Sequence, residues 1–203
     1  MKIIWHGHAC FELRTQEGSV VFDPYAEGSV RGLCLPELCA DAVICSHGHG
    51  DHNAADEVKL TGEMPRFAVE RIPTCHDDCM GAKRGKNLIT VIEAEGLRVA
   101  HCGDLGHTLD EQTLKAVGHV DILMIPVGGF YTIDAKTAKA VCESIDPAMI
   151  IPMHYRGTDK GLERIAPVSD FTELFPADTV RMLDTNELTV TKPLGRQITV
   201  FAW

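Results

Sequence analysis

The sequence lacks the features that mark membrane, exported and nucleic-acid-binding proteins. Its 203 residues contain no run of about 20 apolar residues, so no membrane-spanning helix is expected. The segment Met1–His6 has neither the long apolar stretch nor the cleavage site of a signal peptide. Lys and Arg number 19 against 29 Asp and Glu, and the net charge of −10 opposes binding to a phosphate backbone, which needs an exposed basic stripe. We therefore expect a cytoplasmic protein whose partner is a small molecule, with no nucleic acid and no membrane.

The eight cysteines do not have the regular spacing of a disulfide framework. Without an export signal they are expected to be reduced thiols, and a chain of this length can bury a full core without disulfides. Hydrophobic residues make up 45% and charged residues 24% of the sequence, which is typical of a globular protein. We expect one domain over residues 1–203.

The hydrophobic pattern predicts many short strands and a few helices. Apolar runs that predict strands lie at 2–5, 10–14, 19–23, 42–45, 66–72, 87–94, 97–102, 122–125, 149–152, 179–183, 188–190 and 197–201. Helices are expected at 53–58, 110–117, 134–144 and 169–175, while 25–40 is expected to be a loop with one helical turn. This order predicts sheets sandwiched between helices, with functional residues on loops at strand ends.

One segment carries most of the functional information. Ser46–His52 reads Ser-His-Gly-His-Gly-Asp-His, which places His47, His49, Asp51 and His52 within six positions, directly after a predicted buried strand. Neutral imidazole and carboxylate groups suit borderline divalent ions such as zinc. The segment therefore predicts one half of a two-metal hydrolytic centre.

Residues that complete such a centre also follow predicted strands. Asp104 lies in a glycine-flanked turn and has two oxygens with which to bridge two ions, and His154 follows the strand at 149–152. The remaining imidazole is either His76 or His101. A two-metal centre needs about seven protein ligands, and these residues provide that number.

At these positions the chain resembles the metallo-β-lactamase-fold hydrolases. The resemblance rests on Ser46–His52, on Gly-Asp-Leu-Gly at 103–106 and on Pro-Met-His-Tyr at 152–155. Two further segments, Gly-His-Ala-Cys-Phe at 7–11 and Phe-Asp-Pro at 22–24, resemble the branch that includes ascorbate-phosphate lactonase and N-acyl-phosphatidylethanolamine phospholipase D. The resemblance covers residues 3–158 and implies an α+β fold, the four-layer αββα sandwich.

The resemblance also implies which residue does what. His47, His49 and His76 would bind the first ion, and Asp51, His52 and His154 the second, with Asp104 bridging both. His76 is preferred to His101 because the family's third histidine precedes the bridging aspartate by some tens of residues. His8 and Asp23 are expected to hydrogen-bond the ligands from behind. The expected cofactors are two divalent ions, zinc first, with manganese, iron and nickel as alternatives.

The expected reaction is hydrolysis by a hydroxide that bridges the two ions, with Asp51 and Asp104 as the catalytic carboxylates. An ester, a lactone or a phosphodiester would suit such a centre, and a small anionic substrate is compatible with it because the ions offset the local acidity. The basic run 83–86 is a candidate anion clamp, and the loop 127–134, with Phe130 and Tyr131, is expected to border the pocket. A diiron oxidoreductase and a non-catalytic metal-binding protein are the alternatives, and the oligomeric state is left open.

Overall fold

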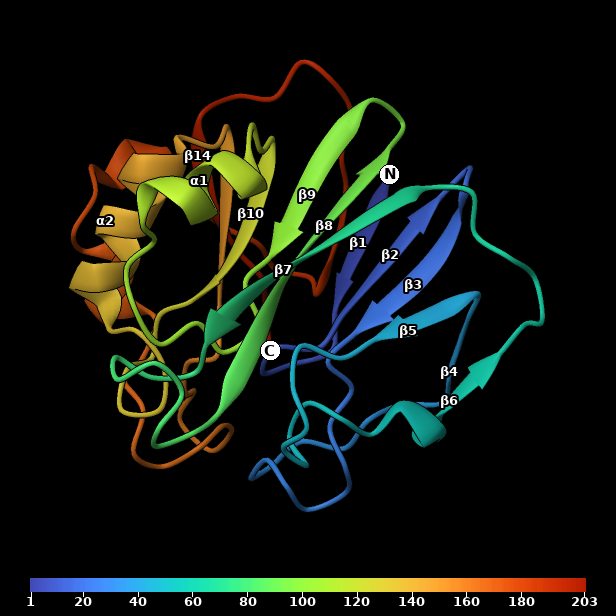
Figure 1. The fold of residues 1–203 in the computed structure, drawn as a ribbon, viewed down its shortest axis with the longest axis horizontal. Helices are drawn as coiled ribbons and strands as arrows, with labels where there is room; N and C mark the ends of the chain where they lie inside the picture. The colour runs from blue at the N-terminus through green and yellow to red at the C-terminus, as the bar shows by residue number, and fades with distance from the viewer.

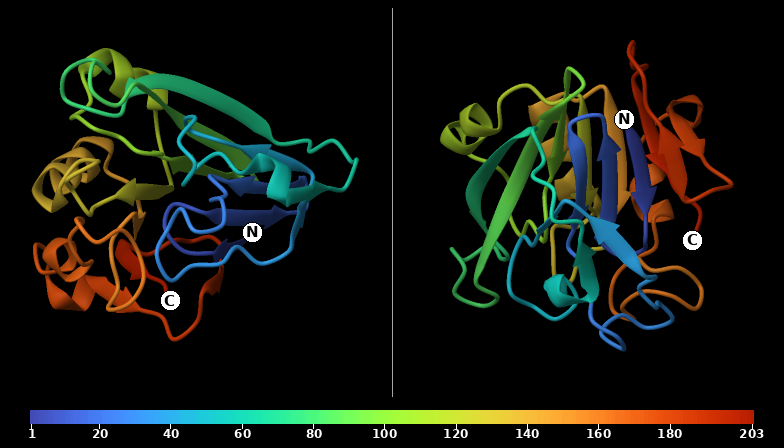
Figure 2. Two further views of the ribbon diagram at one scale, coloured as in Figure 1. Left: turned by 90° about the horizontal axis from the view of Figure 1, so that it is seen from below. Right: turned by 90° about the vertical axis from the view of Figure 1, so that its right-hand side faces the viewer.

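Two β-sheets packed face to face form the centre of the computed structural model, which describes residues 1–203 (Figures 1 and 2). The smaller sheet has five strands, in the order β13 (Glu187–Thr189), β1 (Lys2–Trp5), β2 (Phe11–Thr15), β3 (Gly18–Phe22) and β5 (Ala42–Ile44). The larger has seven, in the order β12 (Val180–Met182), β14 (Gln197–Val200), β11 (Met149–Met153), β10 (Ile122–Pro126), β9 (Leu97–His101), β8 (Lys86–Ala94) and β7 (Ala68–Cys75).

The outer layers differ on the two sides. The helices α1 (Glu111–Val117), α2 (Ala135–Ile145) and α3 (Ser169–Thr172) lie outside the seven-stranded sheet (Figure 1). Outside the five-stranded sheet lie the 3₁₀ turn η1 (Ala55–Glu57) and a two-stranded sheet of β4 (Leu38–Ala40) and β6 (Val58–Leu60), which packs on it through a second, smaller hydrophobic cluster (Figure 1). A second 3₁₀ turn, η2 (Ala177–Thr179), precedes β12. Two sheets between outer layers are consistent with the predicted αββα sandwich, although the layer outside the five-stranded sheet contains no α-helix. None of the helices has both the length and the hydropathy that a bilayer crossing demands.

The interface between the sheets is the main hydrophobic core. A cluster of 39 buried residues draws on both sheets and on the helices. Across the interface, the ring of Phe22 in β3 stacks on that of His101 in β9, with centroids 4.9 Å apart. All five residues of β10 are buried because the strand is central and covered on both faces, which explains its uninterrupted apolar sequence.

Most predicted strands are confirmed to within a few residues, and two local predictions are wrong. The helix expected at 53–58 is the short η1 followed by β6. The helix expected at 169–175 begins at Ser169 as predicted but ends early, at Thr172. The segment 25–40, expected to be a loop, ends in β4, which pairs with β6. The segment Leu-Cys-Ala of β4 is too short to show a clear alternation, and its pairing with β6 decides its conformation.

The topology brings the functional loops to one end of the sandwich. β1, β3 and β5 run in the same direction in the smaller sheet, and β7, β9 and β11 do so in the larger. Each of these six strands is followed within a few residues by a residue singled out from the sequence: His8, Asp23, the 46–52 loop, His76, Asp104 and His154. Carboxyl ends of strands in one direction share an edge of their sheet, so segments distant in sequence meet there.

Candidate metal centre

Three histidines form the more open part of the centre. One ring nitrogen from each of His47, His49 and His76 lies within 4.8 Å of the others. The ring centroids of His47 and His76 are 4.7 Å apart, and those of His49 and His76 are 5.1 Å apart. His49 is exposed while His76 is buried, so this group opens toward solvent. These are the residues expected to bind the first ion.

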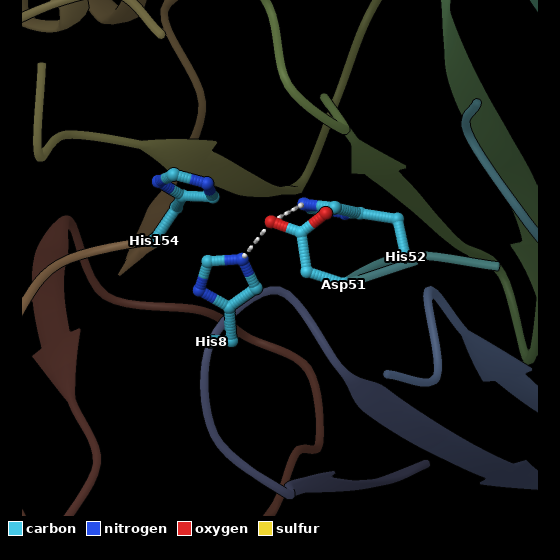
Figure 3. Close-up of side chains that lie close together, drawn as sticks. All are labelled: His8, Asp51, His52 and His154. Atoms are coloured by element: carbon cyan, nitrogen blue, oxygen red, sulfur yellow. Dashed lines mark ion pairs between the residues drawn. The ribbon is translucent and has the colours of Figure 1, made fainter. Parts of the chain in front are cut away.

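A second group is more deeply buried. One donor atom from each of His8, Asp51, His52 and His154 lies within 4.8 Å of the others. Figure 3 shows the imidazole rings around the carboxylate of Asp51, whose Oδ2 atom is 3.3 Å from Nε2 of His8 and 3.7 Å from Nε2 of His52. The three residues expected at the second ion are therefore together, and His8 lies among them rather than behind them.

The carboxylate of Asp104 lies between the two groups. Its Oδ1 atom is 3.2 Å from Nε2 of His52. Its Oδ2 atom is 3.1 Å from Nε2 of His76 and 3.3 Å from Nε2 of His154. One carboxylate thus faces imidazoles of both groups, as a bridging ligand must.

Several of these polar atoms are buried without a hydrogen-bond partner. They include both ring nitrogens of His8 and of His154, Nε2 of His47 and of His52, Nδ1 of His76 and Oδ1 of Asp104. A buried polar atom without a partner is costly, and natural proteins contain few of them. The unpartnered atoms lie together, and all of them belong to imidazole or carboxylate groups. This donor set fits a pair of divalent ions.

His101, the alternative to His76, has a different environment. Its Nε2 atom donates to the carbonyl of Ala9 at 2.9 Å, and its Nδ1 atom accepts from the backbone N–H of Gly103 at 3.2 Å. With both nitrogens used and its ring stacked on Phe22, it is a satisfied core histidine. His107 likewise uses both nitrogens, toward the backbone of Cys75 and Thr108.

Asp23 supports the centre through a dense set of hydrogen bonds. Its Oδ2 atom is 2.8 Å from Nδ1 of His52 and accepts from the Ser46 hydroxyl at 2.6 Å. Its Oδ1 atom accepts from the Ser46 backbone N–H, also at 2.6 Å. A carboxylate on Nδ1 keeps a proton there and makes Nε2, which faces Asp104, the nitrogen available to an ion.

The position of Asp104 is fixed from the strands. The side chain of the buried Asn87 accepts from the backbone N–H of Asp104 at 2.9 Å and donates to Thr74 and to the carbonyl of Cys102. Gly106 lies so close to the chain at His76 that a Cβ atom would be 2.2 Å from the next backbone nitrogen. These contacts join the ends of β7, β8 and β9 and hold the two ligand candidates beside each other.

Electrostatics in the cluster favour metal-binding protonation states for most groups. Burial lowers the pKa of His47 to about 4, and burial together with His154 lowers the pKa of His8 to about 3, so both rings are neutral. Burial alone would raise the pKa of Asp104, but His154 and His52 hold it well below its usual value. Burial also opposes charge on His52, yet Asp104 and Asp23 raise its pKa well above normal. In the metal-free protein a proton on His52 therefore competes with an ion.

A pocket of about 440 Å³ opens onto the centre. Besides His49, Asp51, His76 and Asp104, it is lined by Ser29, Gly50, Arg84, Tyr131 and Leu162. Of the basic run 83–86, only Arg84 belongs to this lining, whereas Lys83 forms an ion pair with Asp78. Phe130 and His107 line an adjoining pocket instead.

One carboxylate, that of Asp77, holds the backbone of the loop that carries Arg84. Asp77 accepts from the backbone N–H groups of Cys79, Gly81, Lys83 and Arg84 at 2.7–2.9 Å. Asp77 was not predicted from the sequence. Its signal was the Asp77-Asp78 pair before a glycine-rich turn, a pattern in which an aspartate commonly binds nearby backbone N–H groups.

Comparison with known proteins gives one family and close structural relatives. A family profile described as the beta-lactamase superfamily domain matches residues 2–154. A UPF0173 metal-dependent hydrolase from Methanoregula boonei is 31% identical over 193 residues, which cover 79% of this chain and 84% of that protein. One from Thermoplasma acidophilum is 28% identical over 191 residues, covering 78% and 85%. A crystal structure from Thermotoga maritima, of a proposed zinc-dependent hydrolase of the metallo-β-lactamase superfamily, has a TM-score of 0.78 and 34% identity, covering 98% of this chain and 97% of that one.

Proposed function

Because the chain belongs to the metallo-β-lactamase superfamily, with the UPF0173 metal-dependent hydrolases as relatives, we propose that it hydrolyses a small anionic ester, lactone or phosphodiester at a two-metal centre. The predicted metallo-β-lactamase fold is confirmed. The observation that carries the proposal is the pair of donor groups, His47, His49 and His76 on one side and Asp51, His52 and His154 on the other, that face a shared Asp104.

Two bound divalent ions would supply Lewis acidity and an acidified water at neutral pH. The protein's own contribution is the donor set that would hold them: Asp104 faces imidazoles of both groups, and Asp23 orients the ring of His52. Asp51 lies at the pocket wall with 22% of its side chain exposed. It is the carboxylate best placed to accept the proton that water loses as it attacks. No serine or cysteine nucleophile is required.

The pocket favours an anionic substrate through Arg84. This side chain is half-buried, and it forms no ion pair with a carboxylate. Its Nη2 atom donates to the carbonyl of Phe130 at 3.0 Å, and its guanidinium lies 5.8 Å from the centre of the Tyr131 ring. A positioned guanidinium with donors to spare suits a carboxylate or a phosphate.

The narrower resemblance to ascorbate-phosphate lactonase and N-acyl-phosphatidylethanolamine phospholipase D supports a lactone or a phosphodiester as the bond type. Zinc is the first ion to test, since the Thermotoga maritima relative is a proposed zinc-dependent hydrolase. Manganese, iron and nickel follow because imidazole and carboxylate ligands accept them too. We also propose that residues 1–203 act as one domain, since one core cluster joins both sheets.

The test is turnover by protein stripped of metal and reloaded with zinc, manganese or iron. Matched chromogenic substrates are compared: a neutral nitrophenyl ester, the same ester with a free carboxylate, a nitrophenyl phosphodiester and a simple lactone. Arg84→Gln is expected to raise KM for the anionic ester about tenfold or more, the equivalent of one charged hydrogen bond. It should leave the neutral ester unchanged.

Lys83→Gln is the matched control, because it removes a neighbouring charge that points at Asp78 rather than into the pocket. Failure of every metal form to hydrolyse any of the four substrates would contradict the proposal. Iron content with a visible absorption band and no hydrolysis would favour the diiron oxidoreductase instead. Stable binding of two ions without any turnover would favour the non-catalytic alternative.

A further inference from the structure

The turn between β1 and β2 directs His8 into the metal centre. The backbone N–H of Cys10 donates to the carbonyl of Gly7 at 2.9 Å, and that of His6 donates to the carbonyl of Cys10 at 2.9 Å. Within this turn, His8 has a φ of 53°, a left-handed conformation that costs a non-glycine residue of order 1 kcal/mol or more. Such a conformation persists where the surroundings require it, often at functional sites.

The backbone of this turn is tied to the opposite sheet. The carbonyl of His8 accepts from the backbone N–H of His154 at 3.2 Å and from the indole N–H of Trp5 at 3.1 Å. The rings of His8 and His154 lie 4.1 Å apart, centre to centre. The position of the His8 ring is therefore coupled to that of a residue expected to bind the second ion.

His8 differs from an ordinary core histidine. Its side chain is fully buried, and neither ring nitrogen has a hydrogen-bond partner. Its Nε2 atom is 3.3 Å from Oδ2 of Asp51, which is longer than the usual range for an N–H···O hydrogen bond. His101, equally buried, has both nitrogens bonded to the backbone. A fully buried imidazole with no hydrogen bond needs another partner.

The surrounding donors identify that partner as a cation. One atom from each of His8, Asp51, His52 and His154 lies within 4.8 Å of the others (Figure 3). Metal bonds of about 2.0–2.2 Å allow ligand atoms to be about 4.4 Å apart, so small side-chain movements bring all four onto one ion.

Resting on the two-metal function above, we propose that His8 is a direct ligand of the second ion. The second ion would then have four donors, from His8, Asp51, His52 and His154, in addition to the shared Asp104. The first ion would have three, all histidines, in addition to Asp104. Five protein donors and one water would give the second ion a coordination number of six. Manganese, iron and nickel accept this coordination number readily, whereas zinc rarely does. The two positions are therefore unequal, and the second should prefer six-coordinate ions.

The decisive variant is His8→Gly, which removes the ring yet suits a positive φ. His6→Ala is the matched control: His6 lies in the same turn but pairs with Glu12 outside the cluster. Metal-free wild type and both variants are titrated with cobalt(II), with the visible d–d spectrum recorded and bound metal measured after dialysis. Thermal unfolding confirms that each variant is folded.

We expect His8→Gly to bind its second cobalt ion at least tenfold more weakly than the wild type. Its spectrum should become more intense, as a lower coordination number requires, and added imidazole should restore the wild-type spectrum. His6→Ala should match the wild type. His8→Asn, a residue that tolerates left-handed conformations, provides a second test if the glycine variant does not fold.

Two results with the His8 variants would overturn the proposal. One is wild-type affinity and spectrum in the folded His8 variants. The other is weaker binding with an unchanged spectrum, which would mean that His8 acts only by positioning Asp51. If the wild type binds two ions with the expected dependence on His8 but hydrolyses no substrate, the proposed function fails while the ligand assignment stands. A wild type that binds only one ion contradicts both.

Discussion

The substitution Asp23→Asn tests whether the orientation of one imidazole controls metal binding. Asparagine has nearly the shape of aspartate, so the turn after β3 should keep its fold. Its amide can still accept from the Ser46 backbone N–H through one oxygen, the contact that measures 2.6 Å in the native protein. The other position becomes an NH₂ group facing Nδ1 of His52, where the native distance to Oδ2 is 2.8 Å.

The amide therefore favours the wrong tautomer of His52. A donor facing Nδ1 makes that nitrogen an acceptor and moves the ring proton to Nε2, which lies 3.2 Å from Oδ1 of Asp104. A protonated Nε2 has no lone pair for an ion. Flipping the amide would return an oxygen to Nδ1 of His52 but place the NH₂ group opposite the backbone N–H of Ser46. Neither orientation keeps both the Ser46 contact and the native tautomer of His52.

Loss of such an outer partner costs about 10–100-fold in metal affinity, or about 1.4–2.8 kcal/mol. The assay is competition for zinc between the protein and a chromophoric chelator. We expect one of the two ions to bind more weakly and the other to keep its affinity. Asp41→Asn is the control, since Asp41 also accepts from a serine backbone N–H and hydroxyl, at 2.7 and 3.0 Å, but lies outside the cluster. Unchanged affinity in Asp23→Asn, or an equal loss in Asp41→Asn, would refute the reasoning.

Further predictions concern individual members of the centre. Asp104→Ala should weaken the binding of both ions and Asp51→Ala mainly that of one, as measured by the metal that stays bound after dialysis. Identical losses of metal in the two variants would contradict the bridging role of Asp104. His101→Phe should keep both ions but lower the free energy of unfolding by about 1–3 kcal/mol, since backbone groups lose their partners; loss of metal would show that His101 is a ligand. Metal uptake at pH 7 should release a proton, because Asp104 and Asp23 overcome the effect of burial and raise the pKa of His52, so affinity should fall as the pH falls below that value. Calorimetry in buffers of different ionisation enthalpy detects this proton, and identical heats of binding would exclude its release.

The sequence was informative wherever a short pattern fixes the geometry. The strand β5, half-buried where its apolar sequence predicted full burial, precedes His47–His52 and places these side chains beyond its carboxyl end. The same holds for Asp104 after β9 and His154 after β11. Parallel strand directions then bring the loops together without further information from the side chains. The convergence of the centre could therefore be predicted, although the ligand roles themselves stay predictions.

Other features depend on packing that no local pattern encodes. His76 follows β7 and His101 ends β9, so both lie at the edge of the sheet where the carboxyl ends of these strands meet. They differ because the His101 ring turns into the core against Phe22, while His76 faces Asp104 at 3.1 Å. The pairing of β4 with β6 also could not be predicted from the local sequence of β4.

Backbone strain connects the fold to the centre. Seven non-glycine residues have a positive φ, and three of them are His8, Asp23 and His154, at 53°, 43° and 53°. Each costs of order 1–3 kcal/mol and is retained only where surrounding structure requires it. All three residues follow strand ends. In each of them the positive φ turns the side chain toward the centre, whereas a relaxed, extended backbone would direct it elsewhere. In the metal-free protein these costs add to those of the unpartnered imidazoles, whereas bound ions would satisfy the same groups. Metal binding should therefore stabilise this chain strongly, and its stability and its proposed activity depend on the same side chains.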